Sequence, residues 1–177
     1  MGHAPLAEYV DVDFSGPVDT AKLPPELSNH LPEGIDAVAA VAVQRSDGSL
    51  QAIVDACTWH LRSIDVDTQA AADRAAELLA APALPATVSR KGKDVDWDLR
   101  PIIRSIDVTP DNGATLLVIE LATAPRGIRI PELLAAFKPL TFSARVTRIN
   151  QWTTTEGSRT EPVPMPPRVS HALRRAS

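Results

Sequence analysis

The residues best suited to chemistry lie in one charged stretch, "RKGKDVDWDLRP", at positions 90–101. Asp94, Asp96 and Asp98 alternate within it, and on an extended strand their carboxylates would share one face, about 6–7 Å apart. Three such carboxylates could hold a divalent cation through oxygen ligands. The adjacent lysines and Arg100 supply counter-charges, however, so the pattern favours a charge ladder along a strand over a metal site.

Cys57 and His60 form a second candidate pair, because Cys-x-x-His is a spacing that metal sites use. Residues three apart on a strand point to opposite faces, so this pair could not share one ion. We therefore expect Cys57 to be a buried core residue. A Gly-x-Ser-x-Gly elbow, a phosphate-binding loop and a dinucleotide fingerprint are all missing from the sequence. No catalytic residue, metal ligand or cofactor is predicted for this chain.

Basic residues are concentrated in the second half of the chain. Residues 1–60 carry a formal charge of −7, whereas residues 88–177 carry +5. This asymmetry suggests an anionic partner, and RNA is the candidate, with Trp97 and Trp152 available for base stacking. The interleaved aspartates would repel phosphate, so the alternative is a charged, solvent-exposed hairpin that binds no RNA. The RNA-binding candidates are Arg90, Lys91, Lys93, Arg100, Arg104 and Arg129.

The elements around these residues follow from periodicity and turn signals. Gly92, between two lysines, predicts a hairpin that displays the basic residues at its tip. Proline follows Arg100, which places Arg100 at a strand edge or entry. We expect Arg100 to pair with a carboxylate from the first half of the chain and so to hold the two halves together.

Residues 52–152 read as strand, helix, strands, strand, helix and strand. The clearest helix begins at Asp67 or Thr68 and ends before Pro82. The expected fold class is α+β, a ferredoxin-like βαββαβ sandwich with an antiparallel sheet and helices on one face.

Three regions are expected along the chain. Residues 1–49 form a partial strand–helix–strand unit, with strands at 6–14 and 35–43; residues 50–152 form the ferredoxin-like domain; and residues 153–177 form a disordered tail rich in proline and arginine. A partial unit leaves a sheet edge uncovered, so self-association is expected.

Composition limits the class of protein. The chain of 177 residues is 44% hydrophobic, which suffices for a core. A single cysteine excludes an internal disulfide and fits a reducing compartment. No apolar run approaches the ~20 residues of a membrane helix, and no secretion signal begins the chain. We expect a cytoplasmic protein with no membrane contact.

Three motifs resemble those of the bacterial radical-SAM-associated protein family, a domain of unknown function. "AEYVD" (7–11), "LPEGI" (31–35) and "KGKDVDWDLRP" (91–101) stand in that family's order and spacing. The resemblance covers roughly residues 5–140. Members usually begin with a further strand, a basic helix and a strand, and the resemblance implies that this chain lacks that segment. The resemblance implies work beside radical SAM proteins or RNA, without an established activity.

Three functions therefore stay open at this point. The first is a non-catalytic accessory module that acts with RNA or with a radical SAM partner protein. The second is an RNA-modifying or RNA-processing enzyme whose site lies partly in the missing N-terminal segment. The third is a structural protein-interaction domain.

Overall fold

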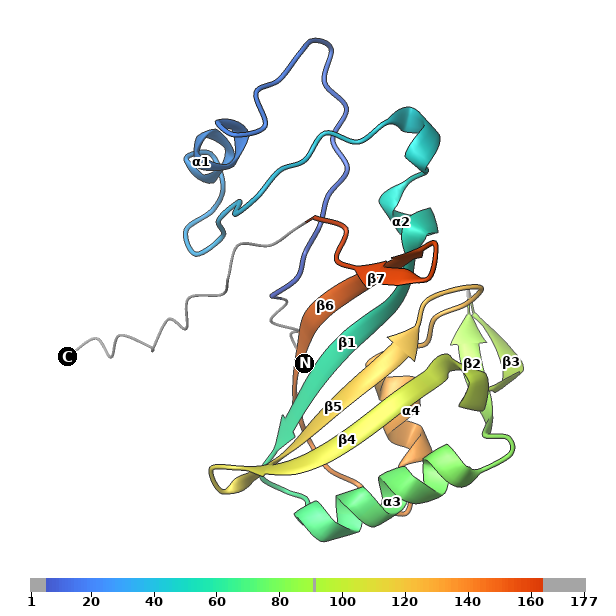
Figure 1. Ribbon diagram of the computed structural model, residues 1–177. Helices are drawn as coiled ribbons and strands as arrows, with labels where there is room; N and C mark the ends of the chain where they lie inside the picture. The colour runs from blue at the N-terminus through green and yellow to red at the C-terminus, as the bar shows by residue number, and fades with distance from the viewer. Residues whose placement is uncertain (1–5, 91, 164–177) are drawn as a thin grey trace, which may run out of the picture.

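The computed structural model describes residues 6–90 and 92–163 (Figure 1). A five-stranded antiparallel sheet forms its body, with the strand order β4-β5-β1-β6-β7. The strands are β1 (Val54–Ser63), β4 (Ile103–Asp111), β5 (Ala114–Ala122), β6 (Arg145–Thr155) and β7 (Ser158–Thr160). The other elements are the helices α1 (Leu23–Ser28), α2 (Leu50–Ile53), α3 (Thr68–Ala80) and α4 (Ile130–Ala136), the strands β2 (Pro85–Arg90) and β3 (Lys93–Asp98), and the 3-10 turns Arg45–Asp47 and Arg100–Ile102.

Helices α3 and α4 cover one face of the sheet, where the main core lies. Leu78 of α3 and Leu133 of α4 join Leu61, Leu117 and Ile119 of the sheet in one buried cluster, and each of these side chains is at most 1% exposed. Leu117, Ile119 and Leu121 alternate along β5, so their side chains share the face that the helices cover. The α+β class is thus confirmed. The order β1-α3-β4-β5-α4-β6 follows the predicted succession, with the β2–β3 hairpin inserted after α3 and β7 added at the edge.

The start predicted for α3 is confirmed, and α4 also begins with a favourable residue. The Asp67 side chain accepts a hydrogen bond from the Ala70 amide at 2.9 Å and caps α3. Pro131 lies in the first turn of α4, where its missing amide proton costs nothing. Asp67 thus sets the start of α3, and α4 begins directly after the loop of residues 123–129.

The N-terminal strands predicted at residues 6–14 and 35–43 are wrong. Neither segment pairs with any described strand. Only the first residues reach the sheet: the Leu6 amide donates to the Arg148 carbonyl at 2.9 Å, and Ala7 is 1% exposed. Alternation makes a segment suitable for a sheet, but a strand also needs a neighbour with which to exchange hydrogen bonds.

The start of the expected disordered tail is also corrected. Residues 153–155 complete β6, and β7 folds back on them through a turn at Glu156 and Gly157, both with positive φ. The Thr153 hydroxyl donates to the Thr160 carbonyl at 3.3 Å. β-Branched threonines on both sides of a glycine turn favour such a hairpin. Residues 164–177 lie outside the described residues.

Candidate nucleic-acid interface

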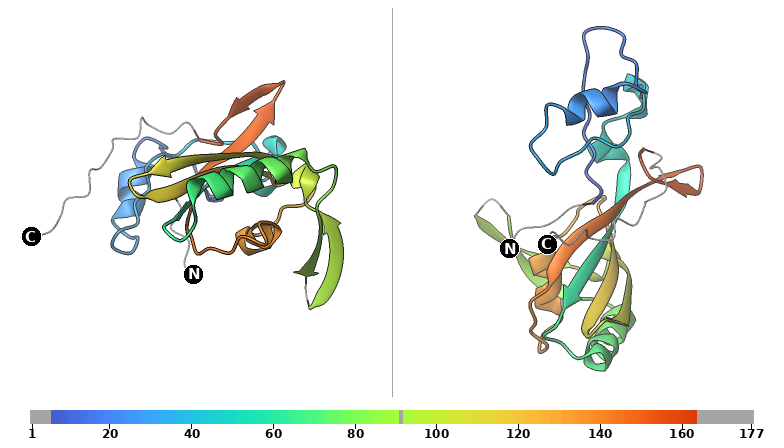
Figure 2. Two further views of the ribbon diagram at one scale, coloured as in Figure 1. Left: turned by 90° about the horizontal axis from the view of Figure 1, so that it is seen from below. Right: turned by 90° about the vertical axis from the view of Figure 1, so that its left-hand side faces the viewer.

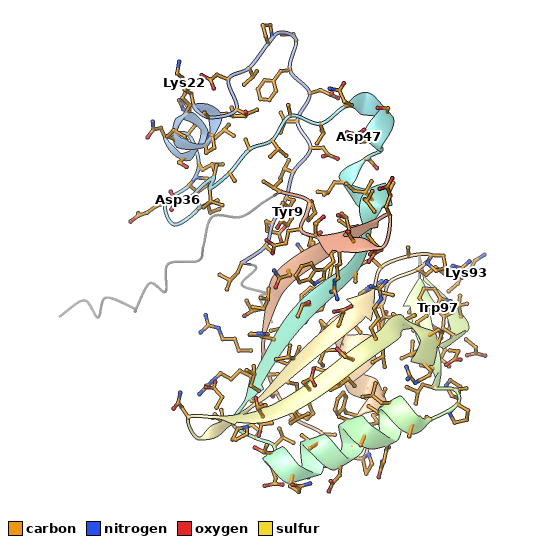
Figure 3. All side chains as sticks on the ribbon, in the orientation of Figure 1. Tyr9, Lys22, Asp36, Asp47, Lys93 and Trp97 are labelled. Carbon is orange, nitrogen blue, oxygen red and sulfur yellow. The ribbon has the colours of Figure 1, made fainter. Side chains whose placement is uncertain are left out.

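The β2–β3 hairpin sorts the charged stretch onto two faces. Val88 lies opposite Val95, and Ala86 lies opposite Trp97. Because side chains alternate along a strand, these apolar residues and Lys93 share one face. The antiparallel pairing of β2 with β3 confirms the predicted hairpin, and Gly92 (φ 76°) lies in its turn. In Figure 3, Lys93 lies at the tip of the hairpin and Trp97 nearer its base. Figure 2 shows the hairpin standing away from the main sheet.

The apolar face of the hairpin rests on a small core of its own. Val88 is 1% exposed and packs in a cluster with Leu99 and Ile102, with Trp97 and Ile128 partly buried beside it. Ile128 belongs to the loop between β5 and α4. The packing therefore fixes this loop, residues 123–129, against the hairpin.

The opposite face carries the three aspartates. The Thr87 hydroxyl donates to the Asp96 carboxylate at 2.8 Å, and the Leu84 and Arg100 amides donate to Asp98 at 2.7 and 2.9 Å. These amide hydrogen bonds lower the pKa of the Asp98 carboxyl below its usual value. Asp98 thus closes the base of the hairpin through backbone amides, in place of the predicted ladder with lysines.

Two arginines of the 123–129 loop contact the hairpin. The Arg126 guanidinium lies 5.5 Å from the centroid of the Trp97 ring. Arg129 donates to the Ser89 carbonyl at 3.4 Å and lies 3.8 Å from a Glu132 carboxylate oxygen. Its side chain is 66% exposed, and Lys93 is also exposed. We call Lys93, Arg126 and Arg129, together with Trp97, the hairpin cluster.

The structure separates the other candidates from this cluster. Arg100 donates to the carbonyls of Leu79 at 3.0 Å and Ile103 at 2.8 Å. The expected carboxylate from the first half is therefore replaced by two backbone carbonyls, which tie the end of α3 to the start of β4. The side chain of Arg90 and all of Lys91 lie outside the described residues.

Arg104 belongs to an ion-pair network on the open face of the main sheet. It lies 3.1 Å from Asp55 and 3.5 Å from Glu120, and Glu120 also pairs with Arg159. The Arg159 guanidinium lies 4.2 Å from the Trp152 ring centroid, so Trp152 is covered. Carboxylates thus balance the bases at this place, which makes it less suited to phosphate than the hairpin cluster.

Cys57 and His60 point to opposite faces of β1, as the spacing predicts. Cys57 is 5% exposed, and its burial raises the pKa of the thiol. His60 lines a shallow depression of about 240 Å³ on the open face, together with Arg62, Arg145 and Leu116. Within the described residues, no group of three His, Cys, Asp or Glu side chains is arranged to hold a metal ion.

Arg126 is the member of the hairpin cluster that sequence reasoning did not select. Its signal was its place in "PRGIR", a basic loop segment directly before a helix. The contact with Trp97 depends on the tertiary packing of Ile128 and could not be read from spacing. Across residues 6–90 and 92–163, the helices are all too short or too polar to cross a membrane.

Comparison with known proteins identifies a family without identifying an activity. The sequence pattern of the uncharacterised bacterial proteins called DUF2344 matches residues 1–129. Neither the curated proteins nor the solved structures contain a match to this chain. Because the match covers well over half of the chain, the protein belongs to the DUF2344 family of uncharacterised proteins conserved in bacteria.

Proposed function

We propose that this protein is a non-catalytic accessory module that binds single-stranded RNA at the hairpin cluster. One observation carries the proposal: in the 123–129 loop, Arg126 lies over the Trp97 ring and Arg129 donates to the Ser89 carbonyl, and the apolar face of this hairpin also bears Lys93. Exposed guanidinium and ammonium groups attract phosphate, and a guanidinium plane also stacks on bases. The aspartates on the other face of the hairpin repel phosphate, so RNA approaches from one side.

The wider setting of this function is an inference from the family resemblance. The three motifs at residues 7–11, 31–35 and 91–101 resemble a family that accompanies radical SAM proteins. We infer that the chain works in the cytoplasm beside such a partner, and that it binds no cofactor of its own. The single cysteine supports this view, because iron–sulfur clusters require several thiolate ligands.

Binding of a fluorescently labelled, unstructured RNA oligonucleotide tests the proposal. The double variant Lys93→Ala/Arg126→Ala removes two positive charges from the hairpin cluster. The matched control, Arg62→Ala/Arg145→Ala, removes two from the depression on the open face. Fluorescence anisotropy should show a clear loss of affinity for the first variant and little change for the second. Equal losses, or a larger loss in the control, would place the contact on the sheet.

A further inference from the structure

The N-terminal arm, residues 10–43, stands beyond the end of the main sheet (Figure 1; Figure 2, right). None of its residues is buried, although many are large and apolar. Val10, Val12, Phe14, Val38, Val41 and Val43 are each between 41% and 79% exposed. Exposed apolar surface of this extent is typical of a site that another molecule covers.

The backbone of the arm indicates what kind of molecule covers it. Residues 38–43 ("VAAVAV") form no helix, turn or bend and are apolar throughout, a composition typical of strands buried on both sides. Their amides donate to no acceptor within residues 6–90 and 92–163. A row of free amides and carbonyls is the template to which an added strand binds.

The charge of the arm indicates whether a second copy of the chain or a different protein covers it. Residues 10–43 contain six carboxylates and one lysine, so their formal charge is −5. Two copies of the arm would bring like charges together, whereas a basic partner would gain from complementary charge.

We propose that the arm is a docking site for a basic partner protein, which adds an apolar β-strand to residues 38–43. The partner's lysines or arginines face the carboxylates of the arm, and its apolar residues cover the exposed valines. This site is separate from the hairpin cluster and does not depend on RNA binding.

Hydrogen exchange of the full chain, followed by NMR, tests this site with defined probes. Three synthetic peptides of equal length alternate valine with lysine, with serine or with glutamate. The lysine–valine peptide should slow the exchange of the amides of residues 38–43 most, and the glutamate–valine peptide least. Ala40→Pro removes one ladder donor and should abolish the protection, while Ala40→Ser keeps the amide and should preserve it.

The remaining outcomes decide the proposal equally clearly. The proposal would be overturned if no peptide slowed amide exchange at residues 38–43. It would also be overturned if the glutamate–valine peptide slowed this exchange as much as the lysine–valine peptide does. Protection that rises with protein concentration alone, accompanied by dimers in sedimentation, would make a second copy the occupant, the self-association expected from the sequence. Unchanged exchange in β1 and β5 shows that Ala40→Pro still folds. Lys93→Ala/Arg126→Ala should leave peptide binding intact, so failure of RNA binding and failure of docking are distinguishable.

Discussion

The Arg126 guanidinium lies 5.5 Å from the centroid of the Trp97 ring, although a whole β-hairpin of the main sheet separates the two residues in the chain. This contact joins the 123–129 loop to the inserted hairpin. It also holds a cation over an aromatic ring, an arrangement that contributes about 0.5–1 kcal/mol at exposed sites. The contact therefore favours this position of Arg126 before any ligand arrives.

Arg126→Ala should weaken RNA binding while lowering the free energy of unfolding by no more than about 1 kcal/mol. Arg126→Lys keeps the positive charge but loses the planar group, so its affinity should fall between those of the wild type and the alanine variant. Anisotropy titrations and urea unfolding measure the two quantities. An alanine variant that binds RNA as the wild type does would remove Arg126 from the interface.

Arg100→Ala should lower the free energy of unfolding without changing the affinity for RNA. Its guanidinium donates to the carbonyls of Leu79 and Ile103, and loss of such partners costs about 1–3 kcal/mol. The control Arg62→Ala breaks a surface ion pair with Asp111, for which about 0.2–1 kcal/mol is expected. Urea unfolding compares the two variants. Equal stabilities would mean that the Arg100 hydrogen bonds contribute little.

Phe137→Ala tests whether α4 closes the main core. Phe137 is fully buried and meets Phe142 edge to face, with ring centroids 5.7 Å apart. Its removal should lower the free energy of unfolding by about 3–5 kcal/mol. Phe14→Ala is the matched control, because Phe14 is 48% exposed in the arm; a change within about 0.5 kcal/mol is expected. A small effect at Phe137 would contradict the packing of α4 on the sheet.

Asp98→Asn should reduce the sensitivity of the fold to acid. The two amide hydrogen bonds lower the pKa of Asp98 in the folded state. The carboxylate therefore contributes stability that is fully present above its unfolded pKa of about 3.9 and is lost as the pH falls through the lower folded value. Urea unfolding at several pH values below that point should show a shallower decline for Asp98→Asn. Identical declines would show that this carboxylate is not linked to folding.

The sequence predicted structure correctly where the signal and its partner lie within a few residues of each other. The Asp67 cap, the Gly92 turn and the opposite orientations of Cys57 and His60 all follow from spacing within one element. It misled at residues 6–14 and 35–43, where alternation predicted strands that have no ladder partner. Arg100 likewise took carbonyl partners that depend on how α3 and β4 pack, which no periodicity encodes.

The same distinction applies to the candidate site. Lys93 and Arg129 could be selected from the sequence as basic residues near a turn and a helix start. The contact of Arg126 with Trp97, by contrast, depends on tertiary packing, with Ile128 on the hairpin core. Charge and turn signals thus identified members of the cluster, and tertiary structure determined which of them meet.

The salt dependence of RNA binding tests the central claim most directly. Each phosphate contact on a single strand contributes about 0.7 to the slope of log affinity against log salt concentration. If Lys93 and Arg126 each contact a phosphate, Lys93→Ala/Arg126→Ala should flatten this slope by about 1.4, by a similar amount for RNAs of different sequence. A wild-type slope in this variant would contradict the account, since neither Lys93 nor Arg126 would then contact a phosphate.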